Sequence, residues 1–217
     1  MIHVTHVCVV LGLTTCLLTG GTKDGRFDNM PGRRGVCYHN LQFVADYGSL
    51  GHSEVVGLTI PEGKVKDFAK VYFSTFVEND RPDKNDRGKE YRSLIGLPGG
   101  ISGSNFLMVE AAAKEQGVGL KFMEGKGDDQ DTLGKKIVWV MDSGKFPFYQ
   151  AEIYHQYHDG FMAGEQYPES YNALAMKAYT QGRLKETGCP DIVSRADMPP
   201  QMSRVPTLYT KNIPDNI

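Results

Sequence analysis

The sequence has few cysteines, a single tryptophan and no excess of either charge. Its four cysteines, Cys8, Cys16, Cys37 and Cys189, show no C-x-x-C spacing, so neither a zinc ribbon nor a disulfide scaffold is indicated. Lys and Arg number 24 against 26 Asp and Glu, a formal net charge of −2. Such a balance provides no basic surface for a phosphate backbone, which argues against nucleic acid as a partner.

Long apolar runs are scarce too. The clearest, residues 7–18, is too short for the roughly 20 residues of a membrane-spanning helix, so no membrane association is expected. Small residues follow it, as in a secretory signal, but no Lys or Arg precedes it. A buried strand or a disordered leader is the alternative. We therefore expect an intracellular protein, cytoplasmic or organellar, rather than a secreted one, and a monomer.

The composition is that of one globular domain. The chain has 217 residues, of which 40% are hydrophobic and 23% charged, enough apolar material for a core. Apolar periodicity predicts strands and helices in alternation, which is typical of an α/β or α+β domain. The predicted strands are 54–60, 93–97, 120–123 and 137–141, and the predicted helices are 65–76 and 105–116, the second capped by Ser102 or Ser104.

The remaining segments are polar or irregular. Residues 19–40 and 78–90 are rich in glycine or charge and predict surface loops. After Pro147 the pattern predicts two helices near the surface, and residues 191–217 predict an extended tail. The predicted organisation is a leader over 1–18, a domain over 19–190 and a proline-rich tail over 191–217.

Two polar stretches stand next to predicted strands. Gly51 to Glu54, GHSE, places a carboxylate at a strand start beside a glycine that permits close backbone approach. Residues 85–93, NDRGKEYRS, end a charged loop in Tyr91, whose hydroxyl can face a cleft while its ring packs below. The alternative interpretations are a turn with an exposed Glu and a solvated loop with a tyrosine at the core edge.

A third stretch, residues 148–156, reads FYQAEIYHQ. On a helix, Glu152, His155 and His158 would be spaced at i, i+3 and i+6, a spacing that could serve a metal. One such helix without a carboxylate cluster elsewhere supplies too few ligands, so no metal is expected.

The three stretches together resemble the A-type methionine sulfoxide reductases, or peptide-methionine (S)-S-oxide reductases. That family carries G-H-x-E-V-V, N-D-x-G-x-x-Y-R-S and A-E-x-Y-H-Q, which occur here in the same order as GHSEVV, NDRGKEYRS and AEIYHQ. The resemblance covers residues 18–191, and the sequence is similar to a eukaryotic, algal or plant-like branch of that family. It implies an α+β two-layer sandwich with a ferredoxin-like core. It also implies reduction of methionine (S)-sulfoxide in oxidised proteins, with thioredoxin as reductant and no cofactor.

The resemblance also implies roles for individual residues. Glu54 would keep its proton through burial and donate it to the sulfoxide oxygen as a thiolate attacks sulfur. Asp86 and Tyr91 would hydrogen-bond around the same oxygen. The residues implied to contact the substrate are His52, Tyr154, His155 and Phe43, the last standing where the family has a further tyrosine. Cys189 is the candidate resolving thiol.

One family motif is missing from the sequence. The nucleophilic cysteine lies in G-C-F-W in the family, and no such motif occurs here; Cys8 and Cys16 lack its aromatic neighbours. Leu18-Thr19-Gly20-Gly21 matches the loop that follows it, so we expect the nucleophile at or before Met1 and the family's first strand and helix to be absent. The chain alone should then have little activity. The alternative function is a reductase-like binding or interaction module without catalysis.

Overall fold

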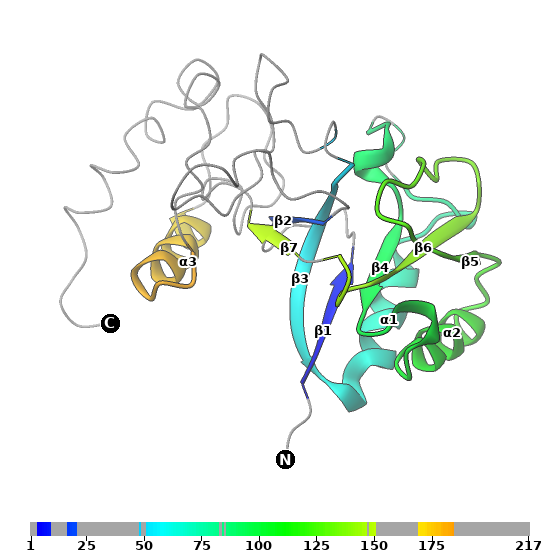
Figure 1. Ribbon diagram of the computed structural model, residues 1–217, viewed down its shortest axis with the longest axis horizontal. Helices are drawn as coiled ribbons and strands as arrows, with labels where there is room; N and C mark the ends of the chain where they lie inside the picture. The colour runs from blue at the N-terminus through cyan, green and yellow to red at the C-terminus, as the bar shows by residue number, and fades with distance from the viewer. Residues whose placement is uncertain are drawn as a thin grey trace.

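A computed structural model gives the fold, shown in Figure 1. It describes residues 4–9, 17–20, 48, 51–82, 84, 86–146, 148–150 and 169–184. Strands and helices are mixed in this part of the chain, which is compatible with the predicted α/β class. The ferredoxin-like core and the two-layer sandwich stay predictions.

Seven strands form one sheet in the order β5-β6-β4-β1-β3-β2-β7. Their bounds are β1 Val4–Val9, β2 Leu17–Gly20, β3 Ser53–Pro61, β4 Leu94–Leu97, β5 Lys121–Glu124, β6 Ile137–Asp142 and β7 Phe148–Gln150. The strands β5, β6 and β4 are parallel. β1 runs antiparallel to both β4 and β3, and β2 runs antiparallel to both β3 and β7.

Periodicity located the central strands well and the outer ones less well. The four predicted strands are confirmed as β3, β4, β5 and β6, each within one or two residues. One prediction was wrong at its edge, because Thr19 and Gly20 belong to β2 instead of a loop. Residues 148–150 form β7, a strand that was not predicted. The cause in both cases is pairing between these two strands, with Thr19 opposite Tyr149, which local propensity does not report.

Both predicted central helices are confirmed. The first, α1, spans Val65–Ser74 and buries Val65, Ala69, Tyr72 and Phe73, the spacing of one helical face. The second, α2, spans Phe106–Glu115. The prediction of Ser102 or Ser104 as its cap was wrong. The N-cap residue is Asn105, whose side chain makes no capping hydrogen bond. Ser102 belongs to a separate 3-10 turn, η3, over residues 100–102, and Ser104 lies one position before the cap. The second of the helices predicted after Pro147 is present as α3, Glu169–Thr180.

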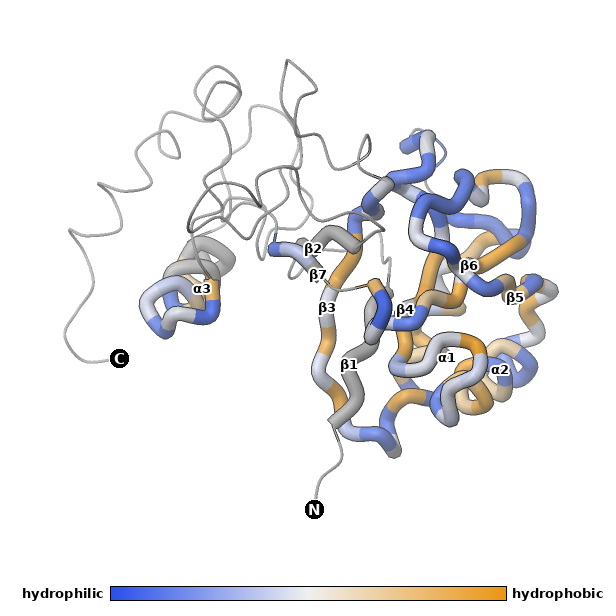
Figure 2. Tube along the Cα trace, in the orientation of Figure 1, coloured by the Kyte–Doolittle hydropathy of each residue, from blue (hydrophilic) through white to orange (hydrophobic). Residues whose placement is uncertain are grey.

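The main core lies between the sheet and the helices α1 and α2. Ile95 and Leu97 of β4, with Val138 and Val140 of β6, share one apolar cluster with both helices. Figure 2 shows hydrophobic residues along these strands and helices. Alternate residues of the same strands, Leu94, Trp139 and Met141, belong to a second cluster, as expected when successive side chains point to opposite faces. Aromatic rings pack edge-to-face in the main core, where the ring centroids of Phe106 and Phe122 lie 5.5 Å apart.

Within the described residues, no helix combines the length and apolar character needed to cross a bilayer.

Candidate functional site

The candidate site lies where β3 begins, because both GHSE and NDRGKEYRS reach this end of the sheet. A turn precedes the strand, in which the Gly51 amide donates to the Gly48 carbonyl over 3.0 Å. Gly51 has φ +79, and a Cβ there would lie 2.8 Å from Oδ1 of Asp128. Only glycine combines this left-handed conformation with so close a neighbour. The glycine of GHSE is therefore required by backbone geometry.

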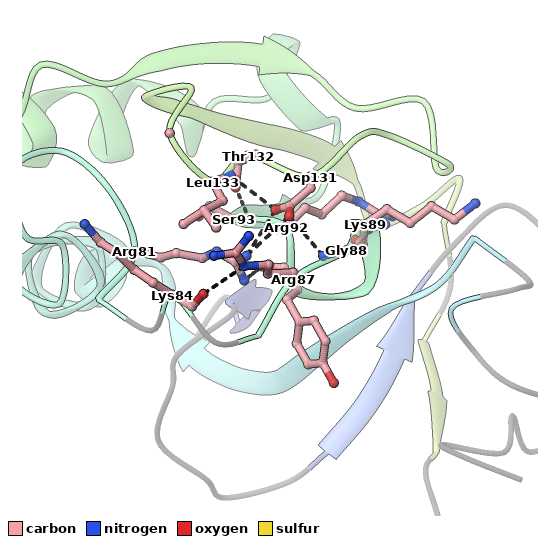
Figure 3. A network of polar contacts seen from close by, with 12 residues as sticks. Arg81, Lys84, Arg87, Gly88, Lys89, Arg92, Ser93, Asp131, Thr132 and Leu133 are labelled. Atoms are coloured by element: carbon pink, nitrogen blue, oxygen red, sulfur yellow. Dashed lines mark hydrogen bonds and ion pairs between the residues drawn. The ribbon is translucent and has the colours of Figure 1, made fainter. Parts of the chain in front are cut away.

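Arg92 joins this turn to two other segments. Its side chain is fully buried. Nη1 donates to the Lys89 carbonyl over 2.6 Å, and Nη2 donates to the carbonyls of Gly51 over 3.0 Å and Gly127 over 2.7 Å. Figure 3 shows Arg92 with Lys89, one of these three partners. Because the guanidinium is planar and its donors point in fixed directions, one side chain holds three backbone segments in a defined relation.

A second bond links the same two motifs. The Ser53 hydroxyl donates to the Lys89 carbonyl over 3.2 Å, across 36 positions of sequence. Ser53 opens β3 immediately before Glu54, and Lys89 opens the 3-10 turn η2, Lys89–Tyr91, which ends at Tyr91. The elements that carry Glu54 and Tyr91 are thus bonded directly to each other.

The loop that carries Asp86 is closed at its base by Arg81 and Asp131. Arg81 is buried, and its Nη1 donates to the Tyr91 carbonyl over 2.9 Å, which ties the start of the loop to its end. Asp131 accepts from the Gly88 amide over 2.9 Å and from Nη2 of Arg81 over 3.4 Å. Figure 3 shows both contacts. We call Ser53, Arg81, Arg92 and Asp131 the polar clamp.

The Asp131 carboxyl has a shifted pKa. Burial raises the pKa of this carboxyl. The backbone amides of Gly88 and Leu133 and the Arg81 guanidinium together lower it by more than burial raises it, so the pKa lies below its usual value. Asp131 is therefore an ionised acceptor at neutral pH, and bonds to a charged acceptor are the stronger kind.

The segment 125–133, here called the acidic loop, is part of this site and was not predicted to be. Asp128 pairs with Nζ of Lys89 over 2.6 Å, and the only tryptophan, Trp139, donates from Nε1 to the Gln130 carbonyl over 2.9 Å. The Asp129 carboxylate accepts from the amides of Lys126 and Gly127. Closely spaced Gly and Asp are typical of such side-chain-stabilised turns, and this was the signal available in the sequence.

The predicted site residues fall into two groups. Glu54 is half-buried on β3 opposite Thr19 of β2, Tyr91 is half-buried at the end of η2, and Asp86 is exposed in the clamped loop. Their convergence on one point stays a prediction. His52 is buried, with its ring 5.1 Å from that of Tyr149 on β7. The others lie outside the described residues: Phe43, Tyr154, His155 and Cys189.

Cys8 is the one cysteine within the described ranges. It lies on β1, paired with Gly57 of β3 on one side and with Gly96 of β4 on the other. No group of three or more His, Cys, Asp or Glu residues in the described part of the chain is arranged to hold a metal. The predicted spacing of Glu152, His155 and His158 lies outside that part.

Comparison with protein-family models, with curated proteins and with solved structures finds no match to this chain.

Proposed function

We propose that this chain is an A-type methionine sulfoxide reductase domain, which acts on methionine (S)-sulfoxide in oxidised proteins with thioredoxin as reductant. The observation that carries the proposal is the set of hydrogen bonds between the GHSE motif, residues 51–54, and the KEYR stretch, residues 89–92. Ser53 and Arg92 both donate hydrogen bonds to the Lys89 carbonyl, and Arg92 also donates one to the Gly51 carbonyl. A site that needs an acid from one motif and a tyrosine from the other requires this kind of link between them.

The chemistry follows from a polarised S–O bond. Glu54 donates a proton to the sulfoxide oxygen while a thiolate attacks sulfur; Tyr91 donates a hydrogen bond to that oxygen, and Asp86 accepts one from it once it is protonated. The S–S bond formed by this attack and the S–O bond of the sulfoxide then break as the oxygen passes to the attacking sulfur, which releases methionine and leaves the thiol as a sulfenic acid. A second thiol reduces that group through a disulfide, which thioredoxin then reduces.

A second candidate function is a sulfoxide-binding module without turnover. The observation that favours it is the absence of G-C-F-W from the 217 residues. Hydrogen bonds to oxygen can hold a sulfoxide but cannot replace a thiolate within bonding reach of sulfur. Both candidates need the oxygen-binding residues and differ only in the nucleophile.

One experiment separates these candidates. The protein is assayed for reduction of a methionine (S)-sulfoxide peptide with dithiothreitol and with thioredoxin, and for binding of the same peptide. We expect binding that Glu54→Gln weakens under either candidate function, whereas turnover several powers of ten below that of a complete reductase would favour the sulfoxide-binding module. Turnover that Cys8→Ser or Cys16→Ser abolishes would identify a nucleophile within this chain and contradict the non-catalytic function. A protein that neither binds nor reduces the peptide would contradict both.

A further inference from the structure

We propose that Arg92 is a positioning residue of the site, one that sets where Glu54 and Tyr91 lie without touching the substrate. This inference rests on the proposed function. Arg92 is fully buried, and its guanidinium is directed to three backbone carbonyls. It therefore acts on the substrate only through the segments that it holds.

The three carbonyls belong to segments that the proposed chemistry needs. Gly51 lies in the turn before β3 and Glu54, and Lys89 begins the turn that ends at Tyr91. Gly127 belongs to the acidic loop, whose Asp128 lies against Gly51 and pairs with Lys89. Arg92 therefore controls two spacings, between β3 and η2 and between both of them and the acidic loop.

Lysine cannot reproduce this arrangement. An ammonium group carries the same charge on a flexible stem, but it lacks the planar, spread set of donors that reaches three carbonyls at once. Arg92→Lys should therefore keep the buried charge and release at least one segment. Because the groups of a binding site must be held within about 0.5 Å of their working geometry, a small release should measurably weaken binding.

The chain contains a reporter of that release. Trp139 is the only tryptophan, and its indole N–H donates to Gln130 in the acidic loop. A protein labelled with nitrogen-15 thus gives one indole N–H resonance, which moves when the acidic loop moves. This signal depends on the clamp geometry and not on any activity.

The experiment is a double-mutant cycle between Arg92→Lys and Glu54→Gln on the full chain. Its readout is the ratio of dissociation constants for a methionine (S)-sulfoxide peptide and the same peptide with methionine. We expect Arg92→Lys to move the indole resonance and to reduce this preference about tenfold, within the range of coupling between residues of one network. In the Glu54→Gln background the further loss should be much smaller, which a general loss of stability would not produce.

Matched variants keep the result decisive. Val109→Ala removes buried volume from α2, in the core that lies away from the clamp, and should lower stability while leaving the preference unchanged. If Arg92→Lys does not fold, Ser53→Ala removes the other bond to Lys89 and should show the same pattern at smaller amplitude.

The outcomes are distinct. A folded Arg92→Lys protein with the wild-type preference would overturn the positioning role and leave the proposed function intact. An equal loss in both Glu54 backgrounds would also overturn it. A wild-type protein without preference for the sulfoxide would overturn the proposed function, and the positioning role with it.

Discussion

The apolar core and the polar clamp are both buried, but they are held by different forces. In the core, Phe73, Ile95 and Val140 are excluded from water and pack without directional bonds. In the clamp, Arg81 and Arg92 are buried with their charges directed at backbone carbonyls. The core tolerates similar shapes, whereas the clamp depends on donor geometry. Stability therefore resides mostly in one region and the placement of the motifs in the other.

The largest effect on stability should come from the core. Phe73→Ala removes a fully buried ring that contacts Tyr72 and Phe122, and should lower the free energy of unfolding by about 3–5 kcal/mol in urea denaturation. Val71→Ala on the same helix is the control. Val71 is 55% exposed, so its truncation should change the free energy by less than about 0.5 kcal/mol. Equal effects of the two variants would contradict the assignment of the core face of α1.

This core was also the part that the sequence predicted best. The apolar residues of 65–76 repeat with the helical period, and residues 137–141 form a short continuous apolar run; both segments contribute to the core. The clamp shows no such repeat. Arg92 and Asp131 look like ordinary charged loop residues, and their burial depends on contacts between segments far apart in the sequence.

The candidate site could be predicted in part for the same reason. The motif resemblance pointed to Glu54 and Tyr91, whose elements the structure joins. It said nothing of the acidic loop, because most hydrogen bonds of that loop involve a backbone atom and leave no fixed pattern of side chains. β7 was not predicted either, since the formation of a three-residue strand depends on pairing with β2 more than on its own composition.

A medium effect is expected at Gly51, where the clamp meets the backbone. Gly51→Ala must adopt φ +79 and place its Cβ against Asp128, which should cost about 1–2 kcal/mol of stability. Adding Asp128→Ala to the Gly51→Ala variant should restore the part of the lost stability that comes from the contact between the new Cβ and Asp128. Gly63→Ala is the control, since Gly63 has no positive φ and no neighbouring atom within 4 Å of where the added methyl would lie. A loss at Gly63 as large as at Gly51 would contradict the explanation.

A smaller and pH-dependent effect is expected at Asp131. Its pKa is lowered in the folded protein, so the unfolded chain takes up its proton first as the pH falls. Its contribution to stability is complete above its usual pKa of about 4 and is lost as the pH falls from there through the folded value. Asp131→Asn should flatten this part of the curve of unfolding free energy against pH. An unchanged slope below about pH 4 would show that the Asp131 bonds to Gly88 and Arg81 contribute nothing.

The smallest effect should come from the ion pairs between α1 and α2. Lys66 and then Lys70 lower the pKa of Glu115 to about 2, and Nζ of Lys70 lies 2.6 Å from its carboxylate. These groups are exposed, so salt should screen the attraction. Glu115→Gln should therefore match the wild-type thermal midpoint in about 1 M salt and differ only slightly at low salt. A large difference that persists in high salt would mean that these pairs matter as much as the clamp.

The most direct test of the central claim is a comparison of three peptides that differ only in one residue: methionine (S)-sulfoxide, methionine (R)-sulfoxide and methionine. A site built to hydrogen-bond one oxygen discriminates strongly against ligands that lack it or direct it elsewhere. We predict that the wild-type chain binds the (S)-sulfoxide at least about tenfold more tightly than the other two, and that Tyr91→Phe and Glu54→Gln each reduce this preference. Equal dissociation constants for all three peptides would contradict the account.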